Sequence, residues 1–280
     1  MNWKRKAHTL QLPNANLKNL KGQIYQQFDG AGLVTSEEYD FKGNLLKKRQ
    51  QILKNYKTSV DWNAVPIPEF TDDLLFRTSN KFDALNRLKE FSNPDGSIYA
   101  AFFNKANLLE KIDVYIRGAT IPTHFVLNIN YNAKGQRQKV EYGNGVITRY
   151  RYDPATFRLI SLHTYKNGKD FQKYQYTYDP IGNITSLEDL ASQTIFFNNA
   201  VVSPKREYRY DPLYRLIEAC GREHAGQVPN NDYEDIPNIN NIPHPNNPNA
   251  LRKYTEYYYY DRAGNISQVK HYANSNNWVK

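Results

Sequence analysis

Tyrosines recur at every second position along several stretches of this chain. The clearest run is Tyr174, Tyr176 and Tyr178. Successive side chains of a β-strand point to opposite faces, so this spacing predicts a strand with its tyrosines on one face. Gln175 and Thr177 then fall on the other face. Other tyrosines share the two-residue spacing, namely Tyr150 with Tyr152 and Tyr208 with Tyr210. Paired hairpins would align these rings, and each cross-strand aromatic pair stabilises a sheet by about 0.2–1 kcal/mol.

The alternating stretches lead into one recurring motif. It consists of an aromatic residue, Asp or Asn, two variable residues, Gly or Asn, and a second strand-like stretch. Clear copies are Tyr39-Asp40-Phe41-Lys42-Gly43-Asn44-Leu45, Tyr178-Asp179-Pro180-Ile181-Gly182-Asn183-Ile184 and Tyr260-Asp261-Arg262-Ala263-Gly264-Asn265-Ile266. Looser copies begin at Phe28, Phe82, Phe103, Tyr131, Tyr152 and Tyr210. Copy starts are separated by 11 residues (28 to 39) up to 50 residues (210 to 260), so the chain is not a strict-period solenoid.

The residue types in the motif are those of a hairpin turn. Asp or Asn accepts a hydrogen bond from the backbone two residues on, and a following proline presets φ. Gly or Asn then supplies the left-handed residue that closes a type I turn with a bulge. Tyr214 stands at that position in one copy, so we expect that turn to differ. The structural repeat turns are predicted at Tyr39, Asp40, Gly43, Phe82, Asp83, Tyr131, Gly135, Tyr152, Asp153, Tyr178, Asp179, Gly182, Tyr210, Asp211, Tyr260, Asp261 and Gly264.

Other segments interrupt the repeat. Tight-turn signals occur at residues 93–96, 142–145 and 166–168. The segment 221–250 is rich in Asn and Pro and is expected to be a long excursion loop between two repeats. Helix signals are weak, with a turn or two expected at Asp72 to Phe76 and at Phe102 to Ile112.

Composition adds limits to this picture. The 280 residues are 40% hydrophobic, with 23 tyrosines and a formal net charge of +9. The basic residues are spread along the chain, which favours solvated strand faces over a nucleic-acid site. Cys220 is the only cysteine, so no internal disulfide can form. No apolar stretch approaches the roughly 20 residues of a membrane span, and residues 1–10 lack the apolar centre of a signal peptide.

Candidate chemistry is sparse. None of the six histidines has zinc-ligand spacing with another histidine or with Cys220. His224 follows Glu223, but neighbours on a strand face opposite ways. One carboxylate per turn favours turn capping over calcium binding, although Asp232, Glu234 and Asp235 form a denser acidic group. Tyrosines beside basic residues could also stack on nucleic acid or sugars. We predict no catalytic residue, no metal ligand and no cofactor.

The repeat resembles a known family. Tyr-Asp-x-x-Gly-Asn is the signature of Rhs and tyrosine–aspartate (YD) repeat proteins. The segments 20–46, 131–145 and 210–224 further resemble the C component of bacterial insecticidal toxin complexes, and the resemblance covers nearly the whole chain. In such C components a protease core and a cytotoxic effector lie C-terminal to the repeats, and the resemblance implies that this chain is a fragment that lacks both.

This resemblance implies an all-β fold, a long antiparallel strip of YD-repeat hairpins over residues 1–280 that curls into part of a hollow shell. It implies a structural, non-enzymatic role in encapsulating a cytotoxic effector for delivery. The implied partners are a B-type shell component, the C-terminal effector and, indirectly, a pore-forming A component, with no nucleic acid and no membrane insertion. The implied localisation is secreted or at the bacterial cell surface. The alternative is a cell-surface YD-repeat adhesion or carbohydrate-binding protein.

Overall fold

The protein is described here from a computed structural model that covers residues 4–6, 14–55, 57–63, 68–226, 246–274 and 277–280. The strands of the first part are β1 (Lys4–Lys6), β2 (Gln26–Phe28), β3 (Gly32–Tyr39), β4 (Leu45–Leu53), β5 (Phe70–Phe82), β6 (Leu88–Ser92), β7 (Ile98–Phe103), β8 (Leu109–Tyr115) and β9 (Thr123–Tyr131). The later strands are β10 (Arg137–Tyr142), β11 (Ile147–Tyr152), β12 (Leu159–Lys166), β13 (Lys169–Tyr178), β14 (Ile184–Asp189), β15 (Ile195–Phe197), β16 (Ala200–Val202), β17 (Lys205–Tyr210), β18 (Leu216–His224), β19 (Leu251–Tyr260), β20 (Ile266–Tyr272) and β21 (Trp278–Val279).

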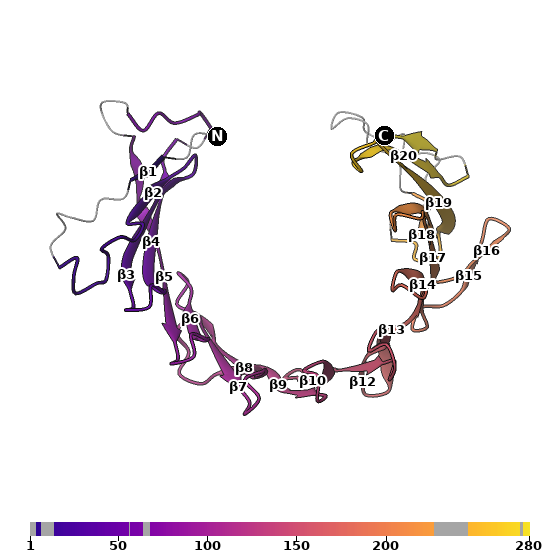
Figure 1. Ribbon diagram of the computed structural model, residues 1–280, viewed down its shortest axis with the longest axis horizontal. Coiled ribbons are helices and arrows are strands. Elements are labelled where there is room, and N and C mark those ends of the chain that lie inside the picture. The colour runs from indigo at the N-terminus through magenta and orange to yellow at the C-terminus, as the bar shows by residue number, and fades with distance from the viewer. Residues whose placement is uncertain (1–3, 7–13, 56, 64–67, 227–245, 275–276) are drawn as a thin grey trace. The chain divides into compact units, whose positions relative to one another are not determined.

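The chain divides into two compact units. Unit 1 comprises Met1–Ile129 with Tyr142–Asn144, and unit 2 comprises Asn130–Glu141 with Gly145–Lys280. In unit 1 each strand pairs antiparallel with the next, from β1 through to β9. Unit 2 does the same from β10 to β21, except that β15 and β16 form a separate hairpin and β14 pairs with β17 (Figure 1). The predicted all-β, antiparallel fold is confirmed.

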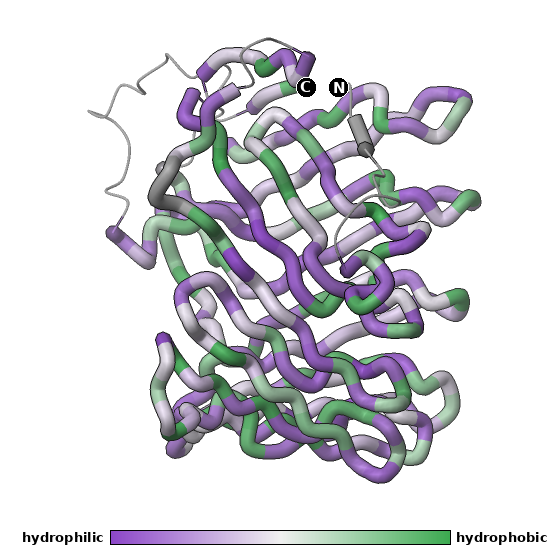
Figure 2. Tube along the Cα trace, turned by 90° about the vertical axis from the view of Figure 1, so that its left-hand side faces the viewer, coloured by the Kyte–Doolittle hydropathy of each residue, from purple (hydrophilic) through white to green (hydrophobic). Residues whose placement is uncertain are grey.

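Polar and apolar residues alternate along many of the strands (Figure 2). Seven of the ladders that end in an aromatic–acid turn shift register beside the aromatic residue, for example between Thr177 and Tyr178, whereas the ladder that ends at Phe28 pairs without a shift. The aromatic residue then pairs with a Leu or Ile, as Tyr178 does with Ile184 and Tyr210 with Leu216. This register shift is the β-bulge that the motif predicts.

Deep burial is limited to small groups of residues. In unit 1, Ala15, Leu20 and Tyr39 form a buried cluster, against which Tyr25 and Leu45 pack. A second group in unit 1 is aromatic: the Trp62 ring contacts Phe28 edge-on at 4.9 Å and stacks on Phe70 at 6.0 Å. A sheet of paired hairpins has few residues covered on every side, so aromatic rings supply much of the contact area.

The two expected helical segments are wrong. Residues 72–76 lie within β5, and residues 102–112 form the end of β7, a turn and the start of β8. Pairing with neighbouring strands outweighs a weak local helix preference, because it satisfies a whole ladder of backbone hydrogen bonds. A short 3-10 helix, η1 (Ile116–Gly118), follows β8.

The expected excursion at 221–250 begins too early. β18 continues through His224 and pairs with β19, with Gly221 opposite Tyr254 and His224 opposite Leu251. Residues 221–224 contain no proline, so nothing prevents them from joining the ladder. Most of the remaining segment, including the acidic group at residues 232–235, lies outside the described residues.

Candidate functional site: the ladder of aromatic–acid turns

The aromatic–acid motifs occupy hairpin turns, and within a unit most of them lie at one end of the strands; the copy at Phe28 joins β2 to β3 and lies at the opposite end. In unit 1 they join β3 to β4, β5 to β6 and β7 to β8, and in unit 2 they join β11 to β12, β13 to β14, β17 to β18 and β19 to β20. The copy at Tyr131 to Gly135 connects the end of β9 to β10. Consecutive strands run in opposite directions, so turns that follow every second strand of a unit return to the same end of the strands.

A single acceptor atom organises each standard turn. Oδ1 of Asp40 accepts hydrogen bonds from the backbone N–H of Lys42 at 2.9 Å and of Asn44 at 2.8 Å. The backbone closes the same turn, since the Asp40 N–H donates to the Asn44 carbonyl and the Gly43 N–H donates to the Asp40 carbonyl. The same arrangement occurs at Asp83, Asn104, Asn132, Asp211 and Asp261.

These hydrogen bonds favour the ionised carboxylate. The side-chain hydrogen bond from Asn44, helped by the backbone donors, lowers the pKa of Asp40. In the copy at Asp211 the backbone hydrogen bond from Arg215 is the largest cause of the lowered pKa. Hydrogen bonds also lower the pKa of the other turn aspartates, namely Asp83, Asp153, Asp179 and Asp261. The turn carboxylates are therefore acceptors with their lone pairs engaged by the chain itself.

The expectation that Tyr214 marks a different turn is wrong. Tyr214 takes a left-handed φ of 63°, and its N–H donates to the Asp211 carbonyl as Gly43 does to Asp40. The hydrogen bonds to Asp211 hold a tyrosine in a conformation that usually favours glycine. Glycine or asparagine takes the same positive φ in the other standard copies, at Gly43, Asn86, Asn107, Gly135 and Gly264.

Other copies depart from the standard turn. The turn after Tyr152 is one residue longer, because Phe157 carries the positive φ and the Asp153 N–H donates to the Arg158 carbonyl. In the turn after Tyr178, Oδ1 of Asp179 accepts from the N–H groups of Gly182 and Asn183. The motif thus tolerates changes in loop length while the acidic residue keeps its role as acceptor.

Sequence reasoning missed the residue that follows the left-handed position. Its side chain clasps the second carboxylate oxygen: Asn44 donates to Oδ2 of Asp40 at 2.8 Å and Arg215 to Oδ2 of Asp211 at 2.7 Å. Arg87, Asn183 and Asn265 do the same in their own turns. A signal was present, because this position is Asn, Arg or Gln in every standard copy except the one that ends at Leu108.

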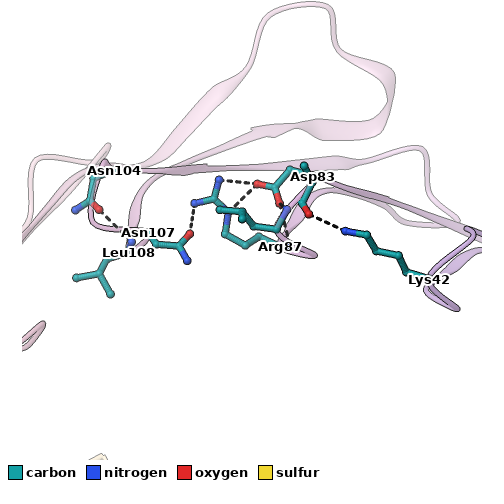
Figure 3. A network of polar contacts seen from close by, with 8 residues as sticks. Lys42, Asp83, Arg87, Asn104, Asn107 and Leu108 are labelled. Atoms are coloured by element: carbon teal, nitrogen blue, oxygen red, sulfur yellow. Dashed lines mark hydrogen bonds and ion pairs between the residues drawn. The ribbon is translucent and has the colours of Figure 1, made fainter.

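Side chains also connect one turn to the next. In unit 1, Nζ of Lys42 donates to the Ala84 carbonyl at 2.7 Å. From that second turn the Arg87 guanidinium pairs with Asp83 at 2.6 Å and also donates to Oδ1 of Asn107 in a third turn (Figure 3). The Arg87 guanidinium carbon lies 4.4 Å from the centre of the Phe103 ring. Three successive turns are therefore bridged by two cationic side chains.

Unit 2 uses arginine in the same way. Arg158 donates to the carbonyls of Asp179 and Pro180 in the next turn, at 2.8 and 3.0 Å. Arg215 lies 4.6 Å from the centre of the Tyr260 ring of the following turn. Each arginine thus holds a neighbouring hairpin by a hydrogen bond or a cation–π contact.

The tyrosine hydroxyls complete the ladder. Tyr178 donates to the Leu159 carbonyl at 2.7 Å, Tyr210 to that of Ile184 at 2.9 Å and Tyr260 to that of Leu216 at 2.8 Å. In each case the acceptor is the first residue of the strand that leaves the preceding turn. Burial raises the pKa of Tyr178 and Tyr210, so their hydroxyls remain protonated donors at neutral pH.

The arrangement positions successive hairpins against one another. Within the described ranges no group of three or more His, Cys, Asp or Glu side chains could hold a metal ion. The helices of those ranges include none long and apolar enough to cross a membrane. Each hydrogen bond between hairpins in the ladder fixes the register of one hairpin against another.

Comparisons with known proteins agree with the sequence pattern. No protein-family model matches the chain. The toxin subunit YenC2 of Yersinia entomophaga is 31% identical over 277 residues, which cover 95% of this chain and 28% of YenC2. The toxin subunit YenC1 of the same organism is 30% identical over 262 residues, which cover 90% of this chain and 26% of YenC1.

Solved structures give the same result. The chain in the crystal structure of TcdB2–TccC3 is 31% identical in sequence to this chain and superposes with a TM-score of 0.74. The match covers 95% of this chain and 13% of the chain in that crystal structure. The Photorhabdus luminescens Tc holotoxin pore with the TccC3 mutation D651A has the same identity and TM-score, with 95% and 12% covered. The chain therefore spans less than a third of the relatives that it matches.

Proposed function

We propose that this chain, which matches an Rhs/YD-repeat segment of toxin-complex C components, is a section of the shell wall that encloses a cytotoxic effector and performs no catalysis itself. The observation that carries the proposal is the match to TcdB2–TccC3 over 95% of the chain at 31% identity and a TM-score of 0.74. That homology supports a role as a component of a bacterial toxin complex.

The geometry supports a wall. The wall of a container must keep a regular geometry over many hairpins. The ladder of turns supplies this regularity, because the hydroxyls of Tyr178, Tyr210 and Tyr260 bond each hairpin to the next. The bulge beside each aromatic residue sets the local twist and pins the register. An enclosed cavity would keep an effector away from solvent and proteases.

The proposed partners follow from the C-component relatives. They are a B-type shell component and a C-terminal effector, with a pore-forming A component acting indirectly at the delivery step. The assembly would be secreted or held at the bacterial cell surface. We propose no contact with nucleic acid and no membrane insertion by this segment.

Co-expression with a B-type component tests the proposal. The expected result is co-purification of the two chains, followed by closed hollow particles in electron micrographs. A matched pair of variants sharpens the assay: Tyr178→Phe combined with Tyr210→Phe removes two inter-hairpin hydrogen bonds and should lower particle yield, whereas Tyr176→Phe should not.

Sizing of the chain alone separates this role from the alternative. Strands at the ends of an open sheet expose unpaired backbone groups, so the isolated chain should associate or precipitate. A monodisperse 32.7 kDa monomer that does not bind the B-type component but does bind a glycan would favour the adhesion role and refute the shell role.

A further inference from the structure

Three successive turns of unit 2 carry large apolar side chains that face solvent. The turns join β11 to β12, β13 to β14 and β17 to β18. We call their four exposed apolar residues the apolar ridge, namely Phe157 (41% exposed), Ile181 (59%), Leu213 (70%) and Tyr214 (54%). A proline follows the aspartate in each of these turns and is itself exposed, at Pro154, Pro180 and Pro212.

The three turns lie at the same end of the strands and are tied to one another. Arg158 of the first turn donates to the carbonyls of Asp179 and Pro180 in the second, at 2.8 and 3.0 Å. The hydroxyl of Tyr210, which precedes the third turn, donates to the carbonyl of Ile184 just after the second. Strands lie about 4.8 Å apart, so turns two strands apart are separated by about 10 Å and the ridge runs for about 20 Å.

The turn geometry itself does not require these residues. In the flanking turns of unit 2 the two variable positions hold Ala133 with Lys134 and Arg262 with Ala263. Those turns close with the same backbone hydrogen bonds, in which the left-handed residue donates to the Asp or Asn carbonyl. Three of the four ridge residues are more than half exposed, and such side chains gain little burial from the folding of their own chain. The ridge therefore calls for a contact outside the isolated chain.

Tyr214 is the clearest case. It holds a left-handed φ of 63° at the position that glycine or asparagine occupies in the other standard turns. The hydrogen bonds of the turn permit this conformation, but they would hold glycine equally well. Strained residues cluster at binding sites, where a contact with a partner offsets the strain.

The carboxylates of these turns are engaged within the chain, and the formal charges cancel. Oδ1 of Asp211 accepts from the N–H groups of Leu213 and Arg215, and Oδ2 accepts from the Arg215 side chain. The three turns contain three aspartates and two arginines, and Lys134 of the preceding turn lies over the Phe157 ring. The ridge thus carries no net charge, which favours apolar contact over ionic attraction.

We propose that the apolar ridge is where this wall section meets the B-type component, an inference that rests on the proposed function. The strands of unit 2 already pair side by side. A wall built from such a strip can therefore widen only at the ends of the strands, and the ridge lies at those ends. The partner surface that fits is apolar, because the turn carboxylates are already engaged and the ridge has no net charge.

The size of the ridge argues against a second copy of this chain as the partner. Four side chains with these exposed fractions present about 400 Å². A stable dimer buries about 800 Å² on each partner, so the ridge alone is too small to hold two copies together. It suits one contact of a larger assembly, and the match to TcdB2–TccC3 covers only 13% of the chain in that crystal structure.

Co-expression with a tagged B-type component tests the ridge. The measured quantity is the ratio of this chain to the B-type component after affinity capture. Ile181→Ser combined with Leu213→Ser should lower that ratio at least about tenfold, the effect of removing one buried large aliphatic side chain from an interface. The control is Phe196→Ser combined with Val201→Ser, which removes similarly exposed apolar residues from the β15–β16 hairpin and should leave the ratio unchanged.

Tyr214→Gly separates binding from folding. It relieves the left-handed strain, so it should raise the unfolding temperature of the chain and yet lower the captured ratio. A captured ratio at the parent level in both ridge variants overturns the inference and leaves the shell role intact, and so does an equal loss in the control. Failure of the parent chain itself to co-purify overturns the shell role together with the ridge.

A photo-crosslinker identifies the partner. With a benzophenone amino acid in place of Leu213, irradiation of the co-expressed complex should join this chain to the B-type component. A product that joins two copies of this chain would overturn the choice of partner.

Discussion

Removal of the Tyr178 hydroxyl tests the inter-hairpin ladder most directly. In Tyr178→Phe the ring remains and the Leu159 carbonyl loses a donor at 2.7 Å. A net hydrogen bond contributes roughly 0.5–1.5 kcal/mol, and a buried acceptor left without a partner costs roughly 1–3 kcal/mol. Tyr178 is partly exposed, so water can replace part of the bond. We therefore expect a loss of about 1 kcal/mol in the free energy of unfolding.

The chain offers a matched control two residues away. Tyr176 lies on the same strand and face, its ring centre is 6.4 Å from that of Tyr178, and its hydroxyl has no hydrogen-bond partner within the described residues. Tyr176→Phe should change the free energy of unfolding by less than about 0.5 kcal/mol. Urea unfolding followed by circular dichroism measures both variants, and an unchanged slope would show that the unfolded states are comparable.

The ladder predicts additivity as well. Tyr178→Phe and Tyr210→Phe remove separate hydrogen bonds to different strands, so their effects should add within about 0.5 kcal/mol. Equal effects of Tyr178→Phe and Tyr176→Phe would refute the reasoning, because they would show that the rings alone stabilise the sheet and the hydroxyls contribute nothing.

Three further predictions concern backbone strain, close approach and pH. Tyr214→Gly should stabilise the chain by about 1 kcal/mol in thermal unfolding, because glycine removes the cost of the left-handed φ; a loss of stability would mean that the tyrosine ring is needed. Gly143→Ala should cost roughly 3 kcal/mol, since its Cβ would lie 1.6 Å from the His124 carbonyl oxygen, and soluble expression at the level of the parent chain would argue against it. Burial raises the pKa of Asp113, but hydrogen bonds from Lys111 and His124 outweigh burial and lower it overall. Its stabilisation is therefore present above about pH 4 and lost on acidification, so Asp113→Asn should flatten the acid limb of an unfolding-versus-pH curve.

The local rules were readable from the sequence because they act over a few residues. Alternating tyrosines predicted strands, and the aromatic–acid motif predicted hairpins with a bulge, since period two and turn chemistry need no distant partner. The resemblance to toxin-complex C components, carried by the repeat together with segments such as 20–46, was confirmed by relatives at 30% and 31% identity.

The failures have local and non-local causes. Pairing with neighbouring strands placed residues 72–76 and 102–112 in strands and a turn, and it extended β18 through residues 221–224, which contain no proline. Tyr214 takes a left-handed φ because the hydrogen bonds of its own turn outweigh the preference for glycine at that position.

The sequence by itself determined that this chain doubles back repeatedly as hairpins, because the turn residues and the strand period are local. Tertiary structure alone decided which hairpins are tied together and by which groups. The Arg87 bridge joins two turns, the Tyr178 hydroxyl bond joins two strands, and the contacts of His271 with Glu223 and Glu256 join three strands. Such contacts depend on register between strands, which no short stretch of sequence specifies.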